Sequence, residues 1–263
     1  MPRDFDMIVW KFPTNDDIRL HFIADVHLGA QEHMTEAWEQ FCASVLEDKS
    51  AYIILGGDLI NNATRNSVSN IFDETMRPAE QKRVMAKMLQ PLRDRILCAV
   101  PGNHEGRSGK DADDDPMYDI MCKLDLEDYW RENIAFVKIQ IGKGNEKSEH
   151  LNTYCLVVTH GAGAGMLPGG VINRNERFGY ALDGCDALLV GHSHKPMVSQ
   201  PGKILIDARN NQVSIKPFKV IVASSWLNYG GYAAKKQFLP TTHTPQIITL
   251  HGVGRSKKIT VTM

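Results

Sequence analysis

The sequence lacks the features of a disulfide scaffold or a membrane-spanning protein. Its five cysteines are odd in number, widely spaced and without any CxxC pair: Cys42, Cys98, Cys122, Cys155 and Cys185. This usage is typical of a reducing compartment. The opening residues, MPRDFD, are too polar to begin a signal peptide, and no apolar run is long enough to cross a bilayer. We therefore predict a cytoplasmic protein with no membrane partner.

The sequence also lacks an excess of either charge, because 30 Lys and Arg residues oppose 31 Asp and Glu residues for a formal net charge of -1. No overall positive field would attract nucleic acid, so a nucleic-acid substrate would have to be gripped locally. The hydrophobic fraction of 43% is ample for a core and excludes a largely disordered chain. Without a repeat, linker or low-complexity segment, residues 1–263 are predicted to form a single domain.

Five short apolar runs are each followed by polar residues of the types that bind metals or act in catalysis. The runs span residues 18–24, 51–55, 96–100, 154–158 and 187–190. Continuous apolar runs of this length are typical of strands buried on both faces. The residues that follow them are Asp25-Val26-His27, Gly57-Asp58, Gly102-Asn103-His104-Glu105, Thr159-His160-Gly161 and Gly191-His192-Ser193-His194.

Helical patterns separate the first strands, and strands alone follow from about residue 200. Helices are predicted over residues 35–48, 79–89 and 116–130, with Thr35 as a cap and Pro91 as a stop. Later strands are predicted over 203–207 and 212–222, as a hairpin about 209–211, and over 246–250 and 258–262. Segments 106–115 and 161–170 read as loops beside the polar residues. This order predicts an α/β fold with two packed sheets and a strand-rich C-terminal part.

The polar residues after the strands suit a site for divalent cations. Strand alternation places residues i and i+2 on one face, so Asp25 and His27 would reach one cation, as would His192 and His194. Asp58 follows two glycines, where its two carboxylate oxygens can bridge two cations. Oxygen and imidazole ligands without thiolates suit Mn, Fe or Zn better than Ca or Cu(I).

In this order and spacing, the five segments resemble the motifs of the calcineurin-like metallophosphoesterase superfamily, over roughly residues 18 to 197. The resemblance implies a two-sheet β-sandwich flanked by helices, a four-layer αββα fold, with the site at the strand ends. It implies two divalent cations, with Mn expected and Fe, Zn, Ni or Mg as alternatives, and a bridging hydroxide that attacks phosphorus in line. One cation would be held by Asp25, His27, Asp58 and His194, and the other by Asp58, Asn103, His160 and His192.

His104 adjoins the expected ligand Asn103, so its side chain should point to a different place. The resemblance implies that His104 protonates the leaving oxygen or steadies the phosphoryl group, and a hydrogen bond that only orients a ligand is the alternative. Glu105 is expected to be structural, through bonds to the backbone or to a ligand residue.

Residues beside the motifs bear on the substrate. Serine/threonine protein phosphatases of this superfamily carry Asp and Arg three and four residues after the bridging Asp, where this chain has Asn61 and Asn62. They also carry Gly where this chain has Leu28, and Asp-x-His-Leu-Gly is closer to the branch of DNA-repair nucleases and phosphodiesterases. We therefore expect a phosphodiesterase or nuclease-type activity on a nucleotide or nucleic acid. A phosphomonoesterase is the first alternative, and a non-catalytic binding module on the same fold is the second.

Several nearby side chains are candidates for contact with substrate. Asn61 is expected to orient His104 through its amide, and Asn62, Arg65 and Arg107 are expected to contact phosphate. Ordinary surface charge is the alternative for each arginine. The segment 229–232, with tyrosines around two glycines, would stack a base or form a turn at the edge of the core.

Overall fold

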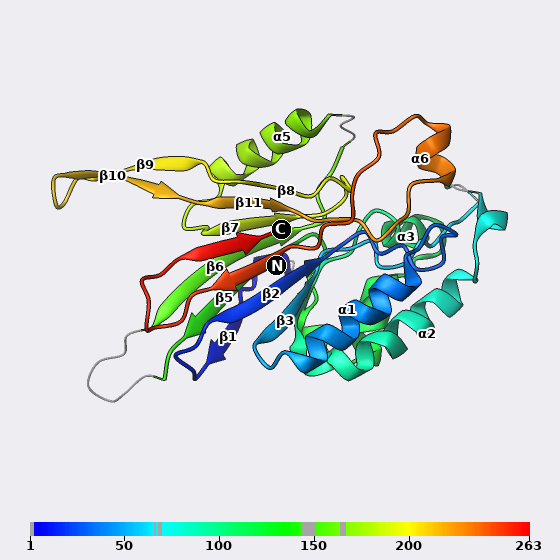
Figure 1. Ribbon diagram of the computed structural model, residues 1–263, viewed down its shortest axis with the longest axis horizontal. Coiled ribbons are helices and arrows are strands. Elements are labelled where there is room, and N and C mark those ends of the chain that lie inside the picture. Colours follow the sequence, from blue (N-terminus) through cyan, green and yellow to red (C-terminus); the bar gives the residue numbers. More distant parts are fainter. Residues whose placement is uncertain (1–2, 66, 68–69, 144–150, 164–166) are drawn as a thin grey trace.

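The computed structural model describes residues 3–65, 67, 70–143, 151–163 and 167–263. Two β-sheets lie face to face at the centre, with helices on both outer sides (Figure 1). The six-stranded sheet has the order β1 (Ile8–Phe12), β5 (Ile134–Ile141), β6 (Asn152–Thr159), β7 (Ala187–Val190), β11 (Lys219–Val222) and β8 (Met197–Ser199). The five-stranded sheet has the order β13 (Ile259–Thr262), β12 (Ile247–Leu250), β2 (Ile18–Ile23), β3 (Ala51–Leu55) and β4 (Ile96–Ala99).

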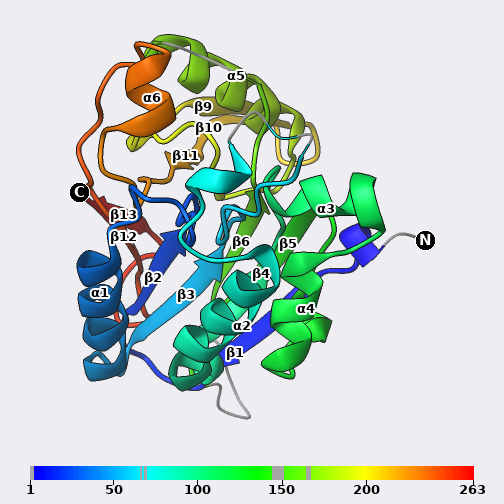
Figure 2. The same cartoon turned by 90° about the vertical axis from the view of Figure 1, so that its right-hand side faces the viewer.

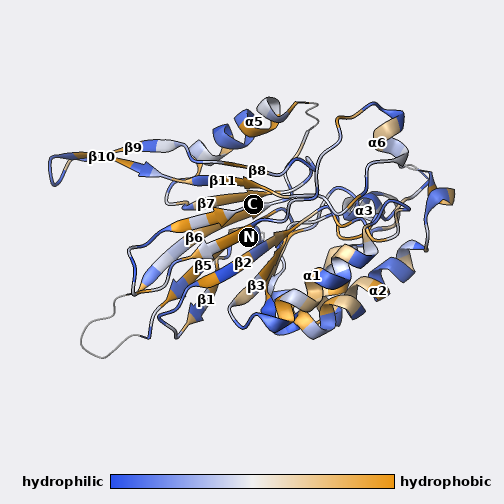
Figure 3. Cartoon of the chain, viewed as in Figure 1, coloured by the Kyte–Doolittle hydropathy of each residue, from blue (hydrophilic) through white to orange (hydrophobic). Residues whose placement is uncertain are grey.

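The main core lies between the two sheets. Buried aliphatic side chains from both sheets form one cluster there, with Leu20 and Ile54 from one sheet and Val137, Leu156 and Leu189 from the other. Hydrophobic residues accordingly concentrate in these central strands (Figure 3). Strand β5 alternates between fully and partly buried residues, as a strand with one core face should.

Helices complete the outer layers. Three helices, α1 (Thr35–Glu47), α2 (Pro78–Leu89) and α4 (Pro116–Lys123), bury Trp38, Met85 and Ile120 against the five-stranded sheet (Figure 2). On the opposite side, α5 (Pro168–Ala181) packs Val171 against Phe218 and Val220 at β11. The predicted αββα arrangement is confirmed. Within the described residues, no helix has the length and apolar character that a membrane span needs.

Several predicted boundaries were wrong. The polar segment 106–115 was expected to be a loop, but Glu105–Ala112 form helix α3, because the buried side chains of Glu105 and Ser108 anchor it to the core. Thr35 is the first residue of α1 and caps nothing with its side chain. Helix α2 does end at Leu89, as predicted from Pro91, although a 3-10 helix follows over Gln90–Arg95. The helix expected over 116–130 divides into α4 and a 3-10 turn, Glu127–Tyr129.

The strand-rich C-terminal part contains the expected hairpin, but the strand expected over 212–222 divides into β10 (Gln212–Pro217) in the hairpin and β11 in the six-stranded sheet. Strands β9 (Gly202–Asp207) and β10 pair with each other in antiparallel register and project beyond the sheets (Figure 1). The short helix α6 (Gly231–Lys235) follows β11. The expected loop 161–170 lies partly outside the described residues, and its last three residues begin α5. A single domain over the whole chain stays a prediction.

Candidate metal centre

The backbone turns sharply where the predicted ligand residues follow the strands. Five of them have left-handed backbone conformations, with φ between 49° and 69°: Asp25, His27, Asp58, His192 and His194. Residues other than glycine adopt this conformation rarely, Asp, Asn and His more readily than most. Each such residue costs about 1–3 kcal/mol, and they cluster at functional sites. The site is therefore built from turns that the surrounding fold holds in place.

The expected reason for the pairing of Asp25 with His27 was wrong. Both residues lie beyond the end of β2, so strand alternation does not set their direction. Their backbone instead runs beside the segment after β3, through hydrogen bonds from the Asp25 N–H to the Gly57 carbonyl (3.0 Å) and from the His27 N–H to the Asp58 carbonyl (2.9 Å). The left-handed turns then aim both side chains at one place.

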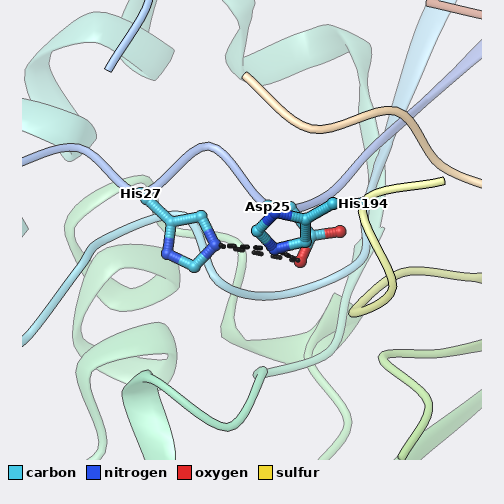
Figure 4. A group of neighbouring side chains, drawn as sticks. All are labelled: Asp25, His27 and His194. Carbon is cyan, nitrogen blue, oxygen red and sulfur yellow. Dashed lines mark hydrogen bonds and ion pairs between the residues drawn. The ribbon is translucent and has the colours of Figure 1, made fainter. Parts of the chain in front are cut away.

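The first group of side chains contains Asp25, His27 and His194 (Figure 4). The Nε2 atoms of the two histidines lie 3.2 Å apart, and His194 Nε2 lies 3.2 Å from Asp25 Oδ1. His27 Nε2 is 3.9 Å from Asp25 Oδ1 and 3.9 Å from Asp58 Oδ2. Three or four potential ligand atoms thus converge on one position.

The second group contains Asp58, Asn103, His160 and His192. His160 Nε2 lies 3.2 Å from Asp58 Oδ2 and 3.1 Å from Asn103 Oδ1. The same Asn103 oxygen lies 2.7 Å from His192 Nδ1. The other nitrogen of His160 is fixed by the Gly56 carbonyl at 2.8 Å, a partner that the sequence did not reveal.

Asp58 belongs to both groups. Its Oδ2 atom faces His27 and His160, while its Oδ1 accepts a hydrogen bond from the His104 N–H at 2.7 Å. Neighbouring glycines make this approach possible, because a Cβ atom on Gly102 would lie 2.1 Å from Asp58 Oδ1. The structure therefore brings all seven predicted ligand residues together, in two groups that share one carboxylate.

The chemistry of these side chains fits a pair of cations. Asp25 Oδ2 and His27 Nδ1 are buried without a hydrogen-bond partner among the residues that the structure describes, and burial lowers the pKa of His27 well below its usual value. Burial would raise the pKa of Asp58, but His104 and His160 hold it well below its usual range. Burial would lower the pKa of His160, but the Asp58 carboxylate raises it to about 10. Without metal, the proton on His160 thus offsets the charge of the Asp58 carboxylate. A bound cation would take over that role.

Glu105 supports the turn that carries Asp58, which confirms its expected structural role. Its carboxylate accepts hydrogen bonds of 2.8 Å from the backbone N–H groups of Asp58, Leu59 and Gly102. Burial, followed by the nearby Asp58 charge, raises the pKa of Glu105 to about 7. One buried side chain therefore joins the segments after β3 and β4.

His104 lies at the edge of both groups, with Nε2 3.8 Å from Asp58 Oδ2 and its ring 4.3 Å from that of His27. Its Nδ1 lies 2.8 Å from the main-chain carbonyl of Asn61. Arg107 donates one hydrogen bond to that carbonyl and lies 2.9 Å from His104 Nε2 with its other terminal nitrogen. Burial lowers the pKa of His104 to about 4.

Two expectations about the asparagines were wrong. The side-chain amide of Asn61 does not orient His104, because it donates to Glu74 at 2.6 Å while the main-chain carbonyl contacts the imidazole. Asn62 cannot contact substrate, because its side chain is fully buried and donates to the His104 carbonyl and to Ser108 Oγ. Asn62 instead fastens α3 to the loop after β3.

The remaining candidates lie at the surface. Arg65 is exposed and lines a cavity of about 580 Å³ together with Glu74 and Arg77, and none of the seven predicted ligands lines it. Tyr229 and Tyr232 are half exposed, with the Tyr229 hydroxyl donating to the Phe238 carbonyl. Contact of these residues with substrate stays a prediction.

Sequence reasoning missed two polar residues that shape the site. Gln81 is fully buried on α2, where it accepts a hydrogen bond from the Asn62 N–H and donates to Glu74. Glu74 in turn accepts from the Asn61 amide. Gln81 could have been noticed in the sequence, since it is a polar residue near the apolar positions of a predicted helix. No feature of the sequence marked Glu74.

The family model described as calcineurin-like phosphoesterase matches residues 18–196. No curated protein matches the chain. A crystal structure from Streptococcus pneumoniae described as a predicted phosphoesterase is 11% identical, with 94% of this chain and 97% of that chain covered and a TM-score of 0.34. The calcineurin-like phosphoesterase YfkN from Bacillus subtilis is 11% identical, with 89% and 85% covered and a TM-score of 0.37.

The family match spans more than half of the 263 residues and includes every residue of the two groups. The chain therefore belongs to the calcineurin-like phosphoesterase family and is a metal-dependent phosphoester hydrolase.

Proposed function

We propose that the protein hydrolyses phosphodiesters of nucleotides or nucleic acid, with two divalent cations, preferably Mn, at the shared carboxylate of Asp58. One would be held by Asp25, His27, Asp58 and His194, and the other by Asp58, Asn103, His160 and His192. The position of Asp58 Oδ2 between His27 and His160 is the observation that supports this most directly. When bound, such cations make water a nucleophile near neutral pH and stabilise charge on phosphoryl oxygens.

His104 is proposed to act on the leaving oxygen. Its Nδ1 is held by the Asn61 carbonyl, so Nε2, which lies 2.9 Å from Arg107, is the nitrogen that faces substrate on the side of Asp58. A negatively charged phosphoryl group beside Nε2 would favour the protonated imidazole, which can then give its proton to the departing alkoxide. Binding without proton transfer is the alternative role.

Arg107 is proposed to contact the phosphoryl oxygens. Its guanidinium already lies beside His104 Nε2, so a substrate at that position would meet both side chains. Guanidinium groups bind phosphate oxygens with short, charge-assisted hydrogen bonds. The positive charge of Arg107 would thereby offset the negative charge of the phosphoryl group between the nucleophile and the leaving group.

The preference for diesters rests on what occupies the position of the phosphatase arginine. That position is Asn62, whose amide is buried against α3 and cannot reach substrate. A diester carries one negative charge at neutral pH and a monoester carries up to two, so a site with fewer cationic contacts favours the diester. The Leu28 side chain, also buried, keeps the first motif distinct from that of the phosphatases.

The test compares bis-(p-nitrophenyl) phosphate with p-nitrophenyl phosphate, each with Mn, Fe, Zn, Ni or Mg supplied to the metal-free protein. We expect faster turnover of the diester, and most with Mn. Asp58→Asn is the matched control and should be inactive with every metal. Monoester turnover that exceeds diester turnover by orders of magnitude would overturn the substrate assignment. Turnover that survives chelation and Asp58→Asn would overturn the metal mechanism.

A further inference from the structure

The projecting hairpin presents an aliphatic surface to solvent. Its paired residues Ile204 with Ile215, and Ile206 with Val213, lie on one face of the two strands. These four side chains are 71%, 74%, 78% and 70% exposed, respectively. Single exposed apolar residues are common on proteins, but four in two adjacent cross-strand pairs form a continuous patch. We call this set the hairpin patch.

The opposite face of the hairpin is mostly polar, with one half-buried leucine, Leu205, and its lysines are turned toward the rest of the protein. Lys203, which pairs with Lys216, donates to the Leu182 carbonyl and lies over the Phe218 ring at 5.1 Å. Lys216 Nζ lies 3.7 Å from Asp186 Oδ1. A strand pair that packs on a protein usually turns its apolar face inward and its polar face to water. This hairpin instead exposes its more apolar face, so its sequence is suited to a surface that something else covers.

We infer that the hairpin patch is the interface of a two-fold dimer of this chain. At these exposures the patch presents on the order of 500 Å² per copy, so two facing copies would bury about 1,000 Å², the lower limit for a specific interface. In a two-fold dimer each patch meets an identical patch, so a charged patch would face like charges and be repelled. The four residues of the hairpin patch are uncharged and cause no such repulsion.

The shape of the hairpin also suits a second copy. The hairpin extends beyond the ends of both sheets (Figure 1), and its exposed apolar face is open to a second hairpin. An isolated two-stranded hairpin is marginally stable, and a second layer would cover the face that the body of the protein leaves open. The partner that the patch fits is therefore another hairpin of the same sequence.

Sedimentation velocity of the manganese-loaded protein at micromolar concentrations tests the inference. The wild type should sediment as a dimer. Ile206→Glu should raise the dimer dissociation constant by about 100-fold or more, because it places two unpaired carboxylates in an apolar contact. Ile215→Glu should do the same from the neighbouring pair. Gln212→Glu, an added charge on the polar face, is the matched control and should remain dimeric.

Metal content and diester turnover of both isoleucine variants should equal those of the wild type, which separates loss of the dimer from loss of folding. A wild type that sediments as a monomer throughout the concentration range would overturn the inference. So would dimers of unchanged strength in both Ile206→Glu and Ile215→Glu.

Discussion

The Nε2 atoms of His27 and His194 lie 3.2 Å apart, although 167 positions separate the two residues in the chain. Both nitrogens face Asp25 Oδ1, and the three side chains come from turns after β2 and β7. Two imidazole nitrogens at this distance share at most one proton, whereas both can bind one cation. The geometry of these turns is thus arranged around a position that a cation would occupy.

Removal of a ligand histidine should remove metal. We expect His194→Ala and His192→Ala each to weaken metal binding by more than about 10–100-fold, the range for losing a residue that only orients a ligand. Elemental analysis after dialysis measures the bound metal. His251→Ala is the control, because His251 contacts Thr260 and none of the seven ligand residues. Full metal content in both variants would contradict the assignment.

His104→Ala should separate turnover from metal binding. The imidazole is proposed to act on substrate, so its loss should lower kcat by about 10²–10⁴-fold while both metals stay bound. Elemental analysis and diester turnover on the same preparation give the two readouts. Loss of a metal in this variant would show that His104 is a ligand instead.

Asn61→Ala should have a small effect, even though it changes a residue beside His104. The atom that contacts His104 is the main-chain carbonyl, which alanine retains, while the lost amide contacted Glu74. Turnover should stay within about tenfold of the wild type, well above that of His104→Ala. A loss as large as that of His104→Ala would mean that the amide side chain acts on substrate after all.

Metal binding should release protons at neutral pH. The Asp58 carboxylate raises the pKa of His160 to about 10 despite burial, so His160 is protonated at pH 7 in the metal-free protein. It must lose that proton to bind a metal, so affinity should rise with pH from about 7 until the pH approaches 10. Calorimetric titration in two buffers of different ionisation enthalpy counts the released protons. His160→Gln should release fewer, and equal release would contradict this origin.

Glu105→Ala should destabilise the fold. The substitution leaves the buried N–H groups of Asp58, Leu59 and Gly102 without their acceptor. Unsatisfied buried donors cost about 1–3 kcal/mol each and are not additive, so we expect a loss of about 3 kcal/mol or more in the free energy of unfolding. Urea unfolding of the metal-free protein measures it. Glu39→Ala, at an exposed position of α1, should change stability by less than about 0.5 kcal/mol.

The parts of the fold that could be predicted are those with a local signal. Runs such as Ala51–Leu55 and Ala187–Val190 are continuous and apolar, and the hairpin of β9 and β10 is marked by Asn210 and Asn211 at its turn. Helix α5 was missed because it contains three glycines, which disfavour helices, and it is stabilised by the packing of Val171 on β11. Strand β5 was missed although its alternation was visible, because Lys138 and Gln140 interrupt the apolar residues.

The residues of the site could be predicted from the sequence, but the atoms through which they make their contacts could not. Residue types and spacing identified Asp58 and His160, because cation chemistry restricts which side chains serve. The sequence does not say which atom of a residue acts, and Asn61 acts through its backbone. It also does not show that Asn62 points inward, since that follows from a left-handed turn and a hydrogen bond to Ser108.

The left-handed turns at the ligand positions restrict how this protein can change. A β-branched residue at position 58 would lose a ligand and also strain the backbone, whereas asparagine tolerates the same φ of 53°. Loss of catalysis without loss of fold is therefore easiest through asparagine or glycine at these positions. Asp58→Asn should accordingly keep the turn and the fold while it loses the shared carboxylate, which makes it an inactive form of the protein with an intact backbone.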